Sequence, residues 1–223
     1  QFAAASMRAR AKAVPANERV SIRRLLRVPA LWKMGVVHFL SNYGFYFLLA
    51  WLPLYLVHTR GYSIGAMTAL TTLSFMTQGV VALAGGWLSD RAVARGADEG
   101  EVRRWLMIAG QIAIGVATAG IAVADGYAML AIWLAVAGFG AGLIATNIFA
   151  VGQIFAGPRA AGSWMGVQNA LGNISGIVGP IVTGLIVDYL GGYGYAFATA
   201  AALSLLGALL WWKMIPQIRT LDL

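Results

Sequence analysis

A charged turn at residues 86–96, GWLSDRAVARG, joins two apolar runs, residues 66–88 and 105–124. Neither run contains Lys, Arg, Asp or Glu. A helix that crosses a bilayer needs roughly 20 predominantly apolar residues, and each run is long enough. We therefore interpret the turn as a loop between two transmembrane helices, and the same alternation along the chain predicts its fold class.

The composition of the 223 residues supports a membrane protein. Charged residues make up 11% and hydrophobic residues 60%, whereas about 25% of the residues in an average soluble protein are charged. The net charge of +8 does not indicate a nucleic-acid partner, because the basic residues lie between apolar runs. The chain contains no cysteine, so it predicts no disulfide and no thiolate metal site, and we expect neither a metal nor another cofactor.

The same criterion of about 20 apolar residues per span predicts six spans within residues 31–216. They lie at about residues 34–57, 66–88, 105–124, 127–149, 163–187 and 195–212. A basic segment, residues 1–30, precedes this bundle, and a tail, residues 217–223, follows it. The predicted fold class is all-α, a polytopic membrane protein with six transmembrane helices surrounded by membrane lipid.

The Lys and Arg residues predict the orientation of the spans. Six spans place residues 1–33, 89–104, 150–162 and 213–223 on one side, which then holds every Lys and Arg except Arg60. Because positively charged loops stay in the cytoplasm, we expect both termini and the tail to be cytoplasmic. The expected location is the plasma membrane, of the bacterial inner-membrane kind.

Three stretches resemble one known family. The pattern Gly86-x-x-x-Asp90-Arg91, with Arg95 beyond it, is similar to the signature loop of the major facilitator superfamily, G-x-x-x-D-R-x-G-R-R, although Val93 replaces its second Gly. Two other stretches resemble helices seven and eleven of the anion:cation symporter branch. These are NYGFY at residues 42–46 with WLPLYL at 51–56, and QNALGNISGIVGP at 168–180. The resemblance covers residues 29–216.

This resemblance implies the C-terminal half of a transporter with twelve helices, in which the six spans form a 3+3 inverted repeat. The N-terminal six-helix half of the same transporter would be its partner. The resemblance further implies secondary active transport of a small organic anion, such as a sugar acid or an aromatic acid, by alternating access. Coupling to a proton or another cation would use residues of the N-terminal half, and no enzymatic activity is implied.

Polar side chains in the middle of a span are costly unless they are paired, so they are candidates for a binding site. A step of 100° per residue places Asn42 and Tyr46 on one face of the first span, and Asn169 and Asn173 on one face of the fifth. Amides and a phenol can bond to the hydroxyls and the carboxylate of a small solute. We predict that these four residues bind the substrate.

Other polar residues in the spans have competing interpretations. Thr71, Ser74, Gln78 and Asn147 are interpreted as hydrogen-bonding groups that hold helices together. His38 is a candidate proton relay, because imidazole titrates near neutrality. It is placed only one turn inside the cytoplasmic end of its span, where exposure to water is the alternative.

The charged turn itself is predicted to control a gate. We expect Asp90 to cap the start of the fifth span near Gly162, because a helix N-terminus carries partial positive charge. Arg91 or Arg95 would then balance the charge of the Asp90 carboxylate. Gly86, the glycine of the motif, is predicted to take part in the same gate. The alternative is a solvated loop that latches nothing.

Small residues predict close contacts between helices, since lipid gives no hydrophobic drive for helix association. On the fifth span these are Gly162-x-x-x-Gly166 and Gly172-x-x-x-Gly176. On the fourth span they are Gly138, Gly140 and Gly142.

Two function classes compete with transport. A six-helix membrane scaffold or subunit, which pairs with a separate partner and transports nothing, would show the same spans. A membrane hydrolase would need a nucleophile and a base, and His38 and His58 are the two histidines available as bases.

Overall fold

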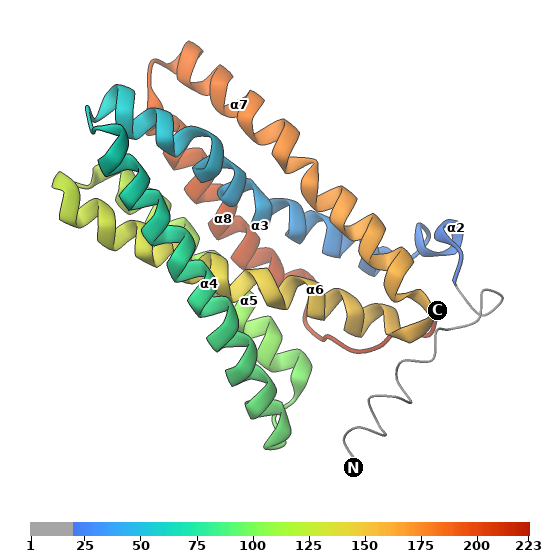
Figure 1. Ribbon diagram of the computed structural model, residues 1–223. Helices are drawn as coiled ribbons and strands as arrows, with labels where there is room; N and C mark the ends of the chain where they lie inside the picture. The colour runs from blue at the N-terminus through green and yellow to red at the C-terminus, as the bar shows by residue number, and fades with distance from the viewer. Residues whose placement is uncertain (1–19) are drawn as a thin grey trace.

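The computed structural model describes residues 20–223, and every regular element in this part of the chain is helical. In order, Figure 1 shows α2 (Ile22–Leu25), α3 (Pro29–Leu54), the π-helical turn η2 (Tyr55–Thr59), α4 (Ile64–Ala94), α5 (Glu99–Val123), α6 (Gly126–Asn173), α7 (Ser175–Leu190) and α8 (Tyr193–Met214). The predicted all-α class is confirmed. Most of the basic segment predicted at residues 1–30 lies outside the described residues.

Five helices of the described part are long and apolar enough to cross a membrane, and one of them covers Gly126–Leu190. That helix is bent, because Gly157 inside α6 has φ 60° and ψ 178°. Glycine adopts positive φ at no steric cost, and Pro158 follows it. Figure 1 shows the chain reversing here, so α6 has a first arm, residues 126–156, and a second arm, residues 158–173, which α7 continues. The five helices therefore make six passes, as predicted.

The loop after the second pass is shorter than predicted. α4 continues to Ala94, so Asp90 lies in its final turns and not in a loop. Gly96, with φ 100°, follows the end of this helix, as glycine commonly does at helix C-termini. Asp98 then caps α5, since its Oδ1 accepts a hydrogen bond from Glu101 N–H at 2.8 Å.

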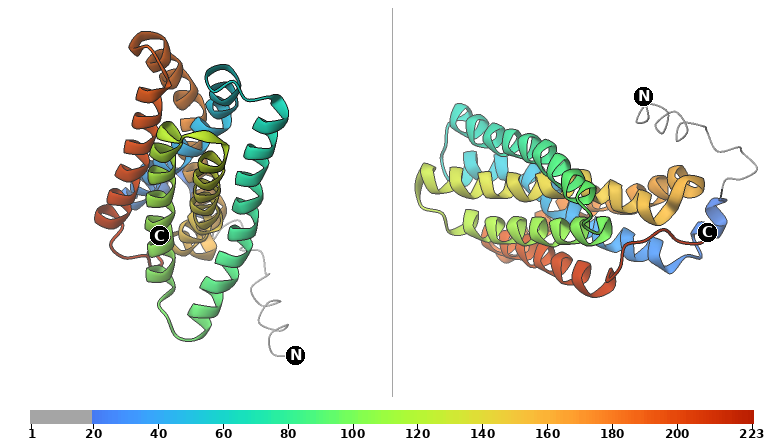
Figure 2. Two further views of the ribbon diagram at one scale, coloured as in Figure 1. Left: turned by 90° about the vertical axis from the view of Figure 1, so that its left-hand side faces the viewer. Right: turned by 90° about the horizontal axis from the view of Figure 1, so that it is seen from below.

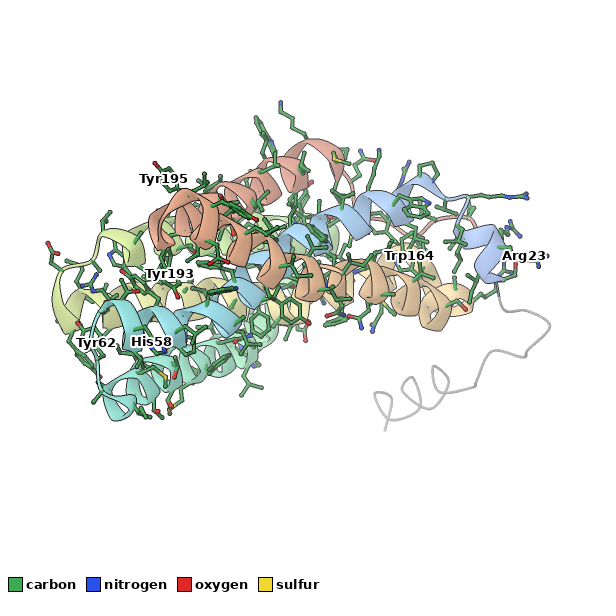
Figure 3. All side chains as sticks on the ribbon, turned by 90° about the horizontal axis from the view of Figure 1, so that it is seen from above. Arg23, His58, Tyr62, Trp164, Tyr193 and Tyr195 are labelled. Atoms are coloured by element: carbon green, nitrogen blue, oxygen red, sulfur yellow. The ribbon has the colours of Figure 1, made fainter. Side chains whose placement is uncertain are left out.

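The bundle has two chemically different ends. The basic end is formed by the loop at residues 95–98 and the α6 bend, and its described basic side chains include Arg91, Arg95, Arg103, Arg104, Arg159 and Lys213. The opposite end comprises residues 60–63, 124–125 and 191–192 and carries Arg60. In Figure 3, Arg23 lies toward the basic end, whereas His58, Tyr62 and Tyr193 lie toward the opposite end.

Two apolar clusters fill the interior between the helices. α5 packs between α6 and α8, and α4 lies against α6 (Figure 2). The cluster toward the basic end contains the fully buried Trp164 and Trp211. The second cluster contains Phe47 and Phe197, whose rings meet edge to face with centroids 5.0 Å apart.

The glycines predicted at contacts on the fourth span lie where the first arm of α6 meets its neighbours. A Cβ on Gly140 would lie 2.6 Å from the Gly110 carbonyl oxygen of α5, and one on Gly142 would lie 2.7 Å from the Gln78 carbonyl oxygen of α4. Gly138 faces α4 in the same way. Backbones approach this closely only because these positions lack side chains, so the prediction is confirmed.

On the fifth span the contact prediction is half right. Cβ atoms on Gly172 and Gly176 would lie 2.6 Å and 3.0 Å from aromatic rings of α3. Gly162 and Gly166, in contrast, have nothing within 4 Å, and both are exposed. The contact predicted at Gly162 and Gly166 is wrong for the described part of the chain, because these glycines face away from its helices.

The segments that flank the bundle contact the α6 bend. In the predicted tail, residues 217–223, Leu221 N–H donates to the Phe155 carbonyl oxygen at 3.0 Å. From the other flank, Val20 N–H donates to the Arg159 carbonyl oxygen at 3.3 Å. Leu25 of α2 is fully buried in the same cluster as Trp164.

Candidate functional site

A polar cavity of about 240 Å³ lies between α3, α4, α5 and α6. Its lining includes all four residues predicted to bind the substrate, Asn42, Tyr46, Asn169 and Asn173. His38, Ser41 and Gln78 add further polar groups. The lining contains no Lys, Arg, Asp or Glu, so this part of the chain offers a solute hydrogen bonds and no full charge.

A direct hydrogen bond joins the two faces of the predicted site. Tyr46 Oη donates to Asn173 Oδ1 at 2.6 Å. Asn173 Nδ2 in turn donates to the Asn169 carbonyl oxygen at 2.8 Å and to Asn169 Oδ1 at 2.9 Å. The phenol and the two amides therefore form one chain of hydrogen bonds between α3 and the second arm of α6.

The helix is irregular where this chain of hydrogen bonds attaches. α6 ends at Asn173, α7 begins at Ser175, and Ile177 N–H bonds to the Ile174 carbonyl three residues back at 3.0 Å. Ser175 Oγ donates to the Gly172 carbonyl at 2.6 Å. Irregular backbone at membrane depth is tolerated where it lines a cavity or is buried in protein, and the Asn173 amide lies at such a break.

A second cavity, of about 150 Å³, adjoins the polar one toward the opposite end of the bundle. The two cavities share Phe45, Gln78, Ile114 and Ala141. The second is mostly apolar, and its remaining lining residues are Leu48, Leu49, Leu52, Pro53, Thr71, Ser74, Phe75 and Ala137. The space available to a solute thus has a polar and an apolar part.

His38 is buried inside the bundle. α3 begins at Pro29, so His38 lies about two and a half turns from the start of the helix. Its side chain is 2% exposed and meets the Phe149 ring edge to face at 5.9 Å. Exposure of His38 to bulk water at the end of the bundle is therefore ruled out in this structure, and the ring lines the polar cavity.

The predicted gate has a different partner from the one expected. Asp90 Oδ1 lies 3.3 Å from the Arg103 guanidinium of α5. The second arm of α6 starts at Pro158 and not near Gly162, and no contact joins Asp90 to it in the described structure. The predicted cap is thus wrong for this conformation.

The other residues of the motif contact their own helix. The Arg91 guanidinium lies over the Trp87 ring at 5.2 Å. The Gly86 carbonyl accepts a hydrogen bond from Ser89 Oγ at 2.9 Å, and the Arg95 N–H bonds to the last turn of α4. Neither Arg91 nor Arg95 balances Asp90 here.

Arg103 is the functional candidate that the sequence reasoning missed. Its side chain is 12% exposed, and besides Asp90 it contacts Glu99 at 2.8 Å and Asn147 Oδ1 at 3.2 Å. Asn147 belongs to the first arm of α6, so Arg103 joins three helices at the basic end. The sequence carries a signal for it, because Glu99 and Arg103 have the i,i+4 spacing of a helical ion pair, but the charges of residues 89–104 favour a loop there.

The polar groups interpreted as links between helices differ in their partners. Asn147 is fully buried and bonds both to Leu143 of its own helix and to Arg103, as predicted. Thr71 instead donates to carbonyls of its own helix. Gln78 lines both cavities, so its side chain is available to a solute.

Arg60 clamps the opposite end of the bundle. One guanidinium nitrogen donates to the Ala124 carbonyl at 2.6 Å, and the other donates to the Tyr55 hydroxyl at 3.1 Å. The hydrogen bond to Tyr55 raises the pKa of Arg60. The end of α3 and η2 is thereby tied to the connection between α5 and α6.

A comparison with known families gives a direct match. Residues 70–221 match the model described as Major Facilitator Superfamily, which is more than half of the 223 residues. The chain belongs to this superfamily. Membership confirms the resemblance predicted from the three stretches and, with the apolar helices, shows an integral membrane protein.

Named relatives of this superfamily chain include plant and bacterial proteins. The chloroplastic ascorbate transporter of Arabidopsis thaliana is 28% identical over 187 residues, which cover 84% of this chain and 34% of that protein. The hexuronate transporter of Bacillus subtilis (strain 168) is 29% identical over 203 residues, covering 86% and 46%. The D-galactonate transporter of Escherichia coli O6:H1 is 30% identical over 176 residues, covering 78% and 40%.

The chain thus spans less than half the length of each of these relatives. Their names are those of transporters, which are not enzymes. Among solved structures, a mutant of the peptide transporter POT in complex with alafosfalin superposes with a TM-score of 0.64 at 17% identity, over 86% of this chain and 41% of that one. At this identity the likeness shows the fold alone, and the fold is that of a major facilitator superfamily half.

Proposed function

We propose that this chain is the C-terminal half of a secondary active transporter that moves a small organic anion by alternating access. The observation that carries the proposal is the Tyr46–Asn173–Asn169 chain of hydrogen bonds on a cavity of about 240 Å³ at a helix break. Phenol and amide groups both donate and accept, so they can exchange their mutual bonds for bonds to a hydroxylated solute.

A sugar acid is the substrate class that this polar cavity favours. Three relatives carry the names of hexuronate, D-galactonate and ascorbate transporters, and these compounds share several hydroxyls beside an acidic group. An aromatic acid is the second candidate, because the adjoining apolar cavity is lined by Phe45 and Phe75 and could hold a ring.

The binding of an anion needs positive charge that this cavity lacks. We propose that the N-terminal half supplies a cation to hold the carboxylate and a titratable group for coupling to a proton or another cation. Large apolar side chains of α4, such as Met76, Val80 and Leu83, are exposed in the described structure. Such a surface suits membrane lipid or an adjoining helical half.

The topology and the gate belong to the same proposal. The basic end faces the cytoplasm by the positive-inside rule, so both termini are cytoplasmic in a plasma membrane of the bacterial inner-membrane kind. The ion pair between Asp90 and Arg103 holds α4 against α5 in one conformation. Release of Asp90 to a partner on the other half would then mark the second conformation, with Gly86, Arg91 and Arg95 shaping the turn.

The decisive experiment reconstitutes both halves in liposomes and measures uptake of radiolabelled D-galactonate, D-glucuronate and benzoate. The proposal expects uptake of D-galactonate or D-glucuronate, and saturable competition between these two acids. Uptake of benzoate alone would assign the aromatic class. If both halves insert correctly and none of these acids moves, the scaffold interpretation replaces transport.

The gate is tested with Asp90→Asn, using labelling of introduced cysteines from the two sides of the membrane. The proposal expects a changed ratio of labelling between the two sides. An unchanged ratio removes Asp90 from the gate and leaves a solvated helix end.

A further inference from the structure

We propose that His38 is a fixed, neutral hydrogen-bond donor to the transported acid, held in its Nε2–H tautomer by Gln168 and Trp164, and that it is not a proton relay. The proposal rests on the proposed function, because it assigns a role within the same cavity. It replaces the expectation that His38 carries protons.

The orientation of the Gln168 amide is determined by its neighbours. Gln168 is fully buried, and its Oε1 accepts a hydrogen bond from Trp164 Nε1 at 2.9 Å. An indole N–H can only donate, so the atom that it meets must be the amide oxygen. Gln168 Nε2 then donates one hydrogen to the Ile148 carbonyl at 3.2 Å. Trp164, labelled in Figure 3, is itself fully buried on the second arm of α6, so this arrangement is anchored in the core.

The second hydrogen of the same amide favours one tautomer of His38. Gln168 Nε2 lies 3.5 Å from His38 Nδ1, a long contact. An amide nitrogen can only donate, so the contact favours an Nδ1 that accepts and carries no proton. A neutral imidazole has one N–H, which is therefore at Nε2. An imidazolium would bring two donors face to face, and the cavity lining contains no carboxylate that would offset this.

The ring lies between Gly172 and the cavity. A Cβ on Gly172 would come within 2.8 Å of Cδ2, Cγ and Nδ1 of the ring. His38 also lines the polar cavity, and the proposal places Nε2 on that side. His38, Asn42 and Tyr46 follow one another at four-residue intervals on α3, so they lie on one face of the helix. They present a row of hydrogen-bonding groups to one solute.

This donor favours one chemical class of solute. Nε2–H binds an oxygen acceptor, such as a hydroxyl or a carboxylate oxygen, and has nothing to offer an aromatic ring in the apolar cavity. His38 should therefore contribute to the affinity for D-galactonate and D-glucuronate and much less to that for benzoate.

The tautomer is tested directly by NMR of the protein labelled with ¹⁵N-histidine, at neutral pH in detergent. The signal of His38 is assigned as the one missing from His38→Gln. The proposal expects the pattern of a neutral ring protonated at Nε2. A ring protonated at Nδ1, or at both nitrogens, overturns it. Gln168→Glu offers acceptors in place of the amide donor, and it should move the proton to Nδ1.

Uptake into proteoliposomes that contain both halves tests the role of the donor. His38→Gln keeps an N–H near the position of Nε2 without a titratable group, whereas His38→Asn is too short to reach it. We expect His38→Gln to keep KM for D-galactonate within about twofold of the wild type, and His38→Asn and His38→Ala to raise it about tenfold, as for one lost hydrogen bond. A proton relay would make His38→Gln as inactive as His38→Ala, and that result overturns the proposal.

Gln168 acts as a positioning residue and has its own readout. Gln168→Glu should raise KM in the wild-type background but add little in the His38→Gln background, because no imidazole remains to be reoriented. Equal effects in both backgrounds would show a structural role alone. If the wild-type protein moves neither sugar acid, the proposed function fails, and the NMR pattern still decides the tautomer.

Discussion

The hydrogen bond between Tyr46 and Asn173 is the smallest unit on which the proposed function rests. It joins α3 to the end of α6 across 127 positions of sequence, at 2.6 Å. The Tyr46 ring also covers Gly176, so loss of the hydroxyl removes the bond and leaves the ring packing in place. Substitutions here can therefore separate hydrogen bonding from shape.

We expect Tyr46→Phe and Asn173→Ala each to raise KM for the transported acid by about threefold to tenfold, the value of one hydrogen bond. Because the two side chains are in direct contact, the double variant measures their coupling as its departure from the product of the two effects. Michaelis–Menten uptake kinetics at matched membrane expression provide the measurement.

The control for Tyr46→Phe is another tyrosine of α3. Tyr43 is 2% exposed, and its hydroxyl has no hydrogen-bond partner among the described residues. Tyr43→Phe should leave KM unchanged. If Tyr46→Phe behaves like Tyr43→Phe, the Tyr46 hydroxyl has no part in binding.

Substitutions of Arg103 and Asp90 should differ in their effect on stability. The Asp90 side chain is 73% exposed, so Asp90→Asn should lower the free energy of unfolding by less than about 1 kcal/mol. Arg103→Ala leaves the buried Asn147 oxygen without its donor and should cost about 1–3 kcal/mol. Thermal unfolding in detergent compares the two, and equal midpoints would show that Arg103 does not join the helices as inferred.

At the scale of the elements, the first arm of α6 organises the bundle. It contacts α4 through Gly138 and Gly142, and α5 through Gly140. The second arm carries glycines of the same spacing, Gly162 and Gly166, but they meet no neighbour within 4 Å. The chain thus contains its own matched control for the effect of a close helix approach.

We expect Gly142→Ala to lower the free energy of unfolding by about 1–3 kcal/mol, because the added methyl group meets the α4 backbone. Gly162→Ala meets nothing and should be neutral or stabilising by up to about 1 kcal/mol, since alanine favours helix over glycine. Unfolding midpoints in detergent decide the matter. A loss of stability at Gly162 similar to that at Gly142 would contradict the packing described for the second arm.

At the scale of the whole molecule, the distribution of basic residues predicts the orientation of the bundle in the membrane. The chain has no cysteine, so single introduced cysteines report position without interference from other thiols of this chain. Ala97 lies in the loop of the basic end, and Thr59 lies at the end of η2, and both are exposed.

We expect an impermeant maleimide to label Thr59→Cys in intact cells, and Ala97→Cys only after permeabilisation, because basic loops remain cytoplasmic. Labelling in the reverse order would invert the proposed topology. It would leave the fold and the cavity unchanged.

The number of passes, their order and the polar groups at mid-depth could be predicted from the linear pattern. Apolar length and charge decide what enters a membrane, and these are properties of a segment alone. The face shared by Asn42 and Tyr46 followed from helical periodicity in the same way. The sequence predicts a loop at residues 150–162, whereas the structure reverses the chain at Gly157 with helix on both sides, because the turn depends on the dihedral angles of that one residue.

Which helix faces which could be decided only by packing in three dimensions. The burial of His38 against Gln168, the partnership of Asp90 with Arg103 and the difference between Gly142 and Gly162 all join residues that are distant in sequence or on different helices. Periodicity shows that two residues share a face, but it does not show what that face meets. The meeting is determined by the fit of whole side chains and backbones between helices, and in this protein that fit places the Nδ1 of one histidine against a donor.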